Sequence, residues 1–189
     1  MKVVRIADCK RMPWKNGGGE TVEIAVSPTG SSVEDFDWRI SMATVATDGP
    51  FSAFAGIDRT LTVLEGQGMT LEIAGMGMVH LGSTSDPMAF PGDVAVHATL
   101  SEGPIVDFNV MTRRNSRHRV VRGHLSDLLQ PDTDADLRMF LALEPITLEM
   151  QQGPVSLGRY DMALCDRSDS PSLVNNESDG KIVLVQIWS

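Results

Sequence analysis

The sequence predicts an all-β protein, built as a sandwich or a barrel, and three observations indicate this fold class. Short runs rich in Val, Ile, Thr and Phe recur along the 189-residue chain, as is typical of strands. Turn-forming residues separate the runs, with 17 Gly and 10 Pro in the chain. Few segments combine a 3.6-residue apolar period with caps at both ends. This pattern favours packed sheets over alternating strands and helices.

The first half of the chain contains most of the predicted strands. Turn signals lie between them, at Asp48–Pro50, Glu65–Gly68, Phe90–Asp93 and Ser101–Pro104. The expected strands are Val3–Ile6, Thr21–Val26, Trp38–Val45, Thr60–Leu64, Met69–Ile73, Val94–Ala98 and Ile105–Met111.

The second half repeats this pattern after a less regular segment. Gly123–Leu129 fits one helical turn, and Asp134–Leu143 fits either a short helix or another strand. Further strands are expected at Thr147–Met150, Val155–Arg159, Ala163–Cys165 and Ile182–Trp188. The sequence therefore predicts two β-rich halves that meet near Arg113–Arg122.

Composition excludes several classes of protein. With 42% hydrophobic residues the chain can bury a core, which excludes wholesale disorder. It has no stretch of about 18 apolar residues that would span a membrane, and its first residues do not resemble a signal peptide. We therefore expect a soluble, cytoplasmic protein with no membrane partner. Cys9 and Cys165 match no metal-binding or redox spacing.

The run Arg113–Arg122 is the strongest local charge feature. A nucleic-acid interface is one interpretation, but the run lacks aromatic residues for base stacking. A formal net charge of −9 also disfavours binding to phosphates. A solvated connection is the favoured alternative, and a surface for a protein partner is a third. Arg113 itself could instead point into a pocket.

The segment Trp14–Thr21 contains three consecutive glycines, Gly17 to Gly19. Glycine loses much conformational entropy on folding, so such a run indicates a backbone requirement. Exposed N–H groups that cradle an anion are one explanation, with Lys15 adding charge and Asn16 a donor and an acceptor. A simple turn between two strands is the other. The run is not a P-loop, because Gly-Lys-Ser/Thr is missing.

Two predicted strands carry polar residues on one face. Alternation in a strand puts Arg39, Ser41 and Ala43 on the same side of one strand. It groups Asp107, Asn109 and Met111 on another. Either face could line a pocket or simply meet solvent. Arg59, at a strand start, could clamp a carboxylate or pair locally with Asp58.

Motifs for catalysis or metal binding are missing from the sequence. The histidines are His80, His97, His118 and His124, and they form no H-x-H or H-E-x-x-H pair. No G-x-S-x-G elbow is present either. We therefore expect no metal, no cofactor and no enzymatic activity.

Taken together, these segments resemble the HutD/Ves family of proteins linked to histidine utilisation. The similar motifs cover residues 3 to 125 best and the remainder weakly. They are Trp14–Gly19 with Thr21, Asp37–Ala43, Gly49–Ser52, Gly56–Arg59, Pro91–Asp93 and Asp107–Met111 with Arg113.

The resemblance implies a bicupin, meaning two small β-barrels or jelly rolls from one chain with few short helices. The expected domains are an N-terminal cupin barrel at residues 1–115 and a C-terminal cupin-like barrel at 116–189. The N-terminal strand is able to pair into the second barrel. Metal-binding cupins carry histidines and a glutamate before a segment like Val63–Gly66, whereas this chain has Arg59 near the expected acid.

The resemblance also implies a non-enzymatic regulator that binds a small anionic intermediate of histidine catabolism, such as N-formylglutamate, and limits expression of the pathway. A cupin-type enzyme acting on a histidine-degradation intermediate is the alternative. A homodimer is left open. The expected ligand-binding residues are Trp14, Lys15, Asn16, Thr21, Arg39, Ser41, Arg59, Asn109 and Arg113.

Overall fold

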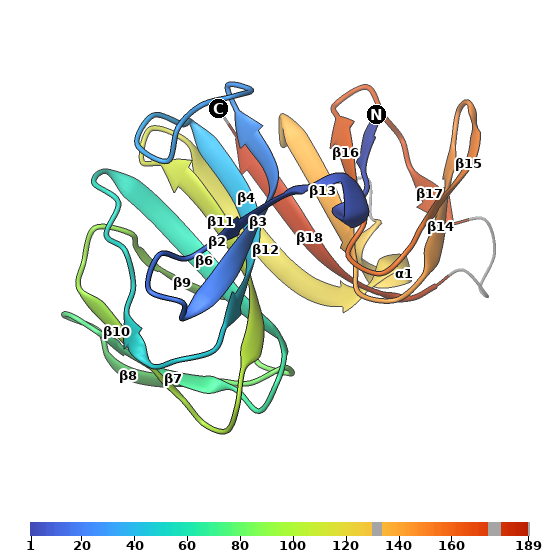
Figure 1. Ribbon diagram of the computed structural model, residues 1–189. Helices are drawn as coiled ribbons and strands as arrows, with labels where there is room; N and C mark the ends of the chain where they lie inside the picture. The colour runs from blue at the N-terminus through green and yellow to red at the C-terminus, as the bar shows by residue number, and fades with distance from the viewer. Residues whose placement is uncertain (130–133, 174–178, 189) are drawn as a thin grey trace. The chain divides into compact units, whose positions relative to one another are not determined.

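The structure is a computed structural model that describes residues 1–129, 134–173 and 179–188. The described part is all-β apart from the 3-10 turn η1 (Ile6–Asp8) and the short helix α1 (Leu125–Leu128), which confirms the expected fold class. Two compact units are present (Figure 1). Residues Lys10–Asn115 form one, called here the first sandwich, and residues Met1–Cys9 with Ser116–Ser189 form the second sandwich.

The first sandwich consists of two antiparallel sheets. Its six-stranded sheet has the order β2 (Lys10–Pro13), β3 (Gly19–Ser27), β4 (Trp38–Val45), β11 (Ile105–Arg113), β6 (Ile57–Glu65) and β9 (Met88–Pro91). Its four-stranded sheet has the order β5 (Gly49–Pro50), β10 (Val96–Leu100), β7 (Met69–Ile73) and β8 (Gly77–Leu81).

Alternate residues of both sheets build the core of the first sandwich. Leu61 and Val63 of β6 are buried in one cluster with Met69, Leu71 and Ile73 of β7. Because side chains alternate across a strand, each of these strands buries one face between the sheets. The burial of these apolar side chains from two sheets holds the unit together.

The second sandwich also has two sheets. The larger has the order β1 (Lys2–Val4), β16 (Met162–Asp166), β13 (Leu137–Ala142), β18 (Lys181–Trp188) and β12 (Arg117–His124). The smaller has the order β15 (Gly153–Leu157), β14 (Ile146–Met150) and β17 (Ser172–Leu173). Phe140, Ile182 and Leu184 pack with Leu148 and Leu157 in its apolar core.

Two segments of open or different expectation form strands. Of the two alternatives for Asp134–Leu143, a short helix or another strand, the structure has the strand β13. The basic segment Arg113–Arg122 is not a loop, because it contains the end of β11 and most of β12, whose residues pair with β18. The many charged side chains of β12 are not typical of a strand, and the sequence therefore did not indicate one here, although Val120 and Val121 are typical strand residues.

The first strand belongs to the second sandwich. Val3 pairs with Ala163 of β16, so the blue N-terminal segment lies beside β16 in Figure 1. The chain therefore passes between the two sandwiches twice, once after Cys9 and once after residue 115, where the division was expected.

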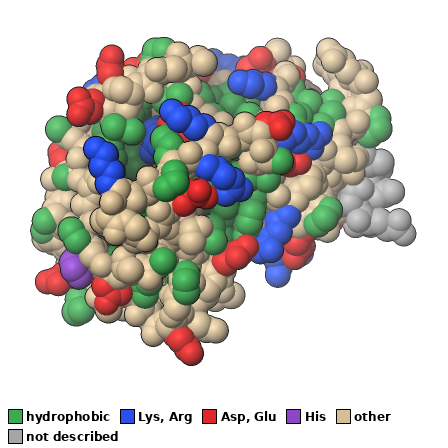
Figure 2. Space-filling view, in the orientation of Figure 1, with side chains coloured by type: hydrophobic (Ala, Val, Ile, Leu, Met, Phe, Trp, Pro, Cys, Tyr) green, Lys and Arg blue, Asp and Glu red, His purple; other side chains and the backbone are tan. Residues whose placement is uncertain are grey.

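Charges of both signs share the surface. On the face drawn in Figure 2, Lys and Arg side chains lie among Asp and Glu side chains. Within the basic segment, the Arg117 guanidinium lies 4.4 Å from the Trp188 ring centre and 3.7 Å from an Asp134 carboxylate oxygen. No helix among the described residues is long and apolar enough to cross a membrane.

Candidate functional site

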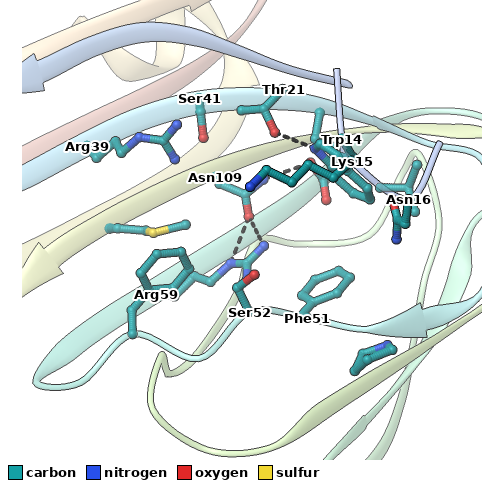
Figure 3. A pocket seen from close by; sticks show the side chains of 16 residues that line it. Trp14, Lys15, Asn16, Thr21, Arg39, Ser41, Phe51, Ser52, Arg59 and Asn109 are labelled. Carbon is teal, nitrogen blue, oxygen red and sulfur yellow. Dashed lines mark hydrogen bonds between the residues drawn. The ribbon is translucent and has the colours of Figure 1, made fainter. Parts of the chain in front are cut away.

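A cavity of about 380 Å³, called here the inner cavity, opens in the first sandwich (Figure 3). Side chains from β3, β4, β6 and β11 line it, together with the turn before β3 and the segment after β5. The structure brings all of the expected site residues except Arg113 to this cavity: Trp14, Lys15, Asn16, Thr21, Arg39, Ser41, Arg59 and Asn109.

Strand register explains why the polar residues converge. In the β4–β11 pair, Ser41 lies opposite Asn109 and Arg39 lies opposite Met111. In the β6–β11 pair, Met111 also lies opposite Arg59. Residues directly opposite one another project from the same face of a sheet, so the alternating polar positions of three strands share one face.

Arg59, Asn109 and Asp107 form a buried polar chain, drawn partly in Figure 3. Arg59 Nε donates to Asn109 Oδ1 at 2.8 Å, and a second guanidinium nitrogen donates to the same oxygen. Asn109 Nδ2 in turn donates to Asp107 Oδ1 at 2.7 Å. Asn109 therefore connects a buried cation to a buried carboxyl group, which satisfies part of the hydrogen-bonding capacity of each.

Burial shifts the ionisation of both ends of this chain. It raises the pKa of Asp107 to about 6, although the charge of Arg59 and the hydrogen bond from Asn109 oppose the shift. It also lowers the pKa of Arg59 to about 10. At neutral pH Arg59 therefore keeps its charge, while Asp107 takes up a proton in weakly acidic solution.

Two aromatic rings enclose the Arg59 guanidinium. Its central carbon lies 4.5 Å from the ring centre of Phe51 and 5.5 Å from that of Phe90. Cations over aromatic faces are stabilised, and more so where water is excluded. The rings and Asn109 thus fix the guanidinium within the cavity lining.

Arg39 has a different partner. It is buried, and its Nε donates to Glu23 Oε2 at 2.8 Å. The ion pair holds the guanidinium against the wall formed by β3 and β4. Because Arg39 and Arg59 each have an acidic neighbour, neither brings an uncompensated charge to the cavity.

The glycine run forms a tight turn that places Trp14. Gly17 adopts a φ of +71°, and its amide donates to Trp14 O at 3.0 Å. The Gly18 amide donates to Asn16 Oδ1 at 3.0 Å. These two amides are used within the turn, so the turn explanation accounts for them and the anion cradle does not.

Gly19 is required for a close approach. A Cβ at this position would lie 2.2 Å from the Thr44 carbonyl oxygen and 3.1 Å from the Trp14 ring. Trp14 Nε1 then donates to Thr21 Oγ1 at 2.8 Å across the same turn. The backbone thereby positions an indole ring as one wall of the cavity.

Lys15 follows Trp14 and is exposed at the cavity edge. Among the described residues, its ammonium group forms no ion pair. Lys15, Arg39 and Arg59 are the cationic side chains that line the inner cavity in the described part of the chain, and of these Lys15 is the one with charge available to a ligand.

Arg113 does not reach the inner cavity. It lines a neighbouring cavity of about 830 Å³, called here the outer cavity. One guanidinium nitrogen lies 3.4 Å from Asp35 Oδ1, and Nε lies 3.9 Å from Asp37 Oδ1. Arg113 continues the inward face of β11, but it lies at the strand end, beyond the inner cavity.

Several lining residues were not among the expected ones. Asp107 precedes Asn109 by two positions, so strand alternation did indicate that it shares the polar face. Phe51, Ser52 and Phe54 come from an irregular segment after β5, where no periodic pattern indicates direction. Among the described residues, no three His, Cys, Asp or Glu side chains lie close enough to hold a metal ion.

The arrangement of two β-sandwiches in one chain is that of a bicupin. The solved structure of vicilin from Corylus avellana (hazelnut) is similar, with a TM-score of 0.62. The match covers 98% of this chain and 85% of vicilin at 9% identity, so the likeness is one of fold alone.

Sequence comparison identifies the family within this fold. The family model named HutD matches residues 6–184, so the chain belongs to the HutD family. Protein Ves from Citrobacter koseri is 43% identical over 119 residues. That match covers 61% of this chain and 61% of Ves, so it spans about three fifths of the length of that relative.

Two solved structures are similar over nearly the whole chain. A conserved protein of unknown function from Pseudomonas aeruginosa PAO1 has a TM-score of 0.81 and 30% identity, covering 100% of this chain and 98% of its own. HutD from Pseudomonas fluorescens SBW25, solved in a formate condition, has a TM-score of 0.74 and 31% identity. This match covers 98% of this chain and 97% of that one.

Proposed function

We propose that the inner cavity binds a small carboxylate that also carries an amide, such as N-formylglutamate, and that the chain acts without catalysis to limit expression of histidine utilisation. Membership of the HutD family supports the link to this pathway. The HutD of P. fluorescens was solved in a formate condition, and formate is the smallest carboxylate. Activity, ligand and partner are all parts of this proposal.

The charge balance of the cavity carries the proposal. Arg39 is paired with Glu23, and Arg59 faces Asp107 through Asn109. Lys15 has no ion pair among the described residues and adds one positive charge. In a chain of net charge −9, a cavity with excess positive charge favours an anion of one or two carboxylates.

We expect Asp107 to take up a proton when the ligand brings a second carboxylate into the cavity. With Asp107 ionised, the cavity offers one unpaired cation; with Asp107 protonated, Arg59 also becomes available. Since the pKa of Asp107 is raised to about 6, weakly acidic solution favours the second state. The proposal therefore includes tighter binding of a dicarboxylate at pH 5.5 than at pH 7.5.

Calorimetric titration with N-formyl-L-glutamate tests the proposal. We expect saturable binding that Lys15→Met weakens on the order of tenfold, because it removes one charged hydrogen bond to a carboxylate. Lys181→Met, which changes an exposed lysine of the second sandwich, is the matched control and is expected to bind like the unmodified protein. Equal affinity in the protein and Lys15→Met would contradict the proposed site.

An enzyme acting on the same compound is the alternative, and Asp107 favours it. A buried carboxyl group with a pKa raised to about 6 is suited to general acid–base chemistry. Prolonged incubation with N-formyl-L-glutamate, followed by measurement of free formate, separates the two functions. We expect no formate above the level in buffer, whereas release that Asp107→Asn abolishes would establish the alternative.

A further inference from the structure

The outer cavity adjoins the inner one. Both are lined by Trp14, Lys15, Thr21, Arg39, Ser52 and Phe54. Lys15 and Ser52 are exposed, so the boundary between the cavities is not a sealed core of packed side chains. A ligand held in the inner cavity can therefore extend across these residues into the outer one.

The outer cavity is largely apolar beyond this boundary. Phe36 and Phe54 meet edge to face with ring centres 6.4 Å apart, and Phe36 packs with Ile57 and Met111 in a small buried cluster. Val33 also lines the cavity, yet 48% of it is exposed, which makes it one of the few large hydrophobic residues open to solvent. When an apolar group covers apolar surface that faces an open cavity, both leave water, and the free energy of the complex falls.

The charged groups of the outer cavity do not favour an anion. Among the described residues, Arg113 is the one cation of its lining apart from the shared residues, and Asp35 and Asp37 both lie near its guanidinium. Glu34 adds a further negative charge to the lining. Away from Lys15 and Arg39, which line both cavities, a carboxylate would meet Glu34, Asp35 and Asp37 against the single charge of Arg113, so this part of the outer cavity differs from the inner one in the chemistry it accepts.

We propose that the outer cavity binds the aliphatic acyl chain of an N-acyl amino acid whose carboxylate and amide occupy the inner cavity. This inference rests on the proposed function and names its ligand class: short-chain N-acyl amino acids, with the formyl compound as the smallest member. The outer cavity, at about 830 Å³, is larger than the inner one, at about 380 Å³, so it has room for several methylene groups.

Three N-acylated glutamates test the inference by calorimetric titration at pH 7.5. N-formyl-L-glutamate is the reference, N-hexanoyl-L-glutamate adds an apolar chain, and N-adipoyl-L-glutamate adds a chain of the same length that ends in a carboxylate. We expect the hexanoyl compound to bind on the order of tenfold more tightly than the formyl compound, because its methylene groups leave water. The adipoyl compound is expected to gain nothing over the formyl compound.

A pair of variants assigns the gain to the outer cavity. Val33→Asp puts a charge among the apolar residues, so the ratio of hexanoyl to formyl affinity is expected to fall close to one. Met76→Asp changes a residue of nearly equal exposure, 47%, that does not line this cavity, and is expected to preserve the ratio.

The outcomes separate this inference from the proposed function. Binding of the formyl compound with no gain from the hexanoyl chain would overturn the inference and leave the proposed function standing. A gain that persists in Val33→Asp would overturn it as well. If no N-acylated glutamate binds, the proposed function itself fails, and the inference fails with it.

Discussion

Arg59 holds its charge inside the cavity lining with only a few polar neighbours. It is buried between the rings of Phe51 and Phe90. The side-chain oxygen of Asn109 accepts its hydrogen bonds, and the side-chain nitrogen of Asn109 donates to Asp107. A guanidinium so enclosed contributes to the fold as well as to the cavity. Lys15 is better suited to test ligand binding alone, because it is exposed.

Arg59→Ala is expected to lower the free energy of unfolding by about 3 kcal/mol, because it leaves Asp107 buried without a cation. Urea unfolding followed by tryptophan fluorescence measures this loss. Arg11→Ala, which removes an exposed ion pair with Glu20, is the control and is expected to change stability by less than about 1 kcal/mol. Similar midpoints for the two variants would show that the buried chain contributes little.

Asp107 is expected to make stability depend on pH. Its pKa is about 6 in the folded chain, above the ordinary value of 3.8 that the carboxyl group has when the chain is unfolded, so the folded chain binds the extra proton between these values. The stabilisation that the protonated Asp107 gives the folded chain is therefore complete below about pH 4 and is lost as the pH rises through about 6. The resulting fall in the free energy of unfolding is about 3 kcal/mol at most. The groups facing Asp107 are Arg59, Asn109 and the Ala43 amide.

Comparison with Asp107→Asn isolates this effect. The difference in unfolding free energy between the protein and the variant, measured at several pH values from 4 to 7.5, cancels the other titrating groups. We expect this difference to shift in favour of the variant as the pH rises. A difference that stays constant over the range would mean that Asp107 does not titrate there.

At the scale of single elements, the turn before β3 and the two strands β4 and β11 decide where the polar side chains lie. Because Gly19 has no side chain, the backbone of this turn can approach the Thr44 carbonyl group, and the turn then sets the position of Trp14. The inward face of β4 and that of β11 were both predictable, because alternation alone groups Arg39 with Ser41 and Asp107 with Asn109.

Gly19→Ala is expected to destabilise the first sandwich by about 2 kcal/mol, since the new methyl group overlaps backbone that has no room to move. Gly49→Ala is the matched control, because a Cβ at Gly49 meets no atom within 4 Å. Thermal unfolding of both variants measures the difference. Equal melting temperatures would show that the turn relaxes without loss.

At this scale, the sequence does not predict which way side chains point in irregular segments. Phe51 and Phe54 have no periodic neighbours from which a facing could be derived, and both lie against the cavity. Arg113 illustrates the opposite error: alternation gave its face correctly, but the length of β11 carries it past the inner cavity.

At the scale of the whole molecule, the fold class and the presence of two units were predictable from strand spacing and from the resemblance. The separate pairing of residues 1–9 was only an open option, because pairing between distant segments leaves no local trace in a sequence. Arg5 and Ile6 both donate to Asp161, 2.7 Å and 3.0 Å away, and so attach this segment to the second sandwich.

Asp161→Ala is expected to loosen this attachment. Although burial alone would raise the pKa of Asp161, the hydrogen bonds from Arg5, Ile6 and Gly158 lower it below its usual value, so the carboxylate is stabilised in the folded chain. Hydrogen exchange measured by mass spectrometry should become faster in β1 and β16 but not in the first sandwich. Asp8→Ala, an exposed position of the same unit, should leave exchange unchanged.

The discontinuous second sandwich has a consequence for synthesis on the ribosome. All strands of the first sandwich have been synthesised once residue 115 is added, so this unit can assemble while the rest of the chain is still being translated. The second sandwich needs β18, which lies between β13 and β12 near the C-terminal end of the chain. The nascent β1 also lacks its partner strand, β16, while about 160 residues are translated, and it therefore docks late.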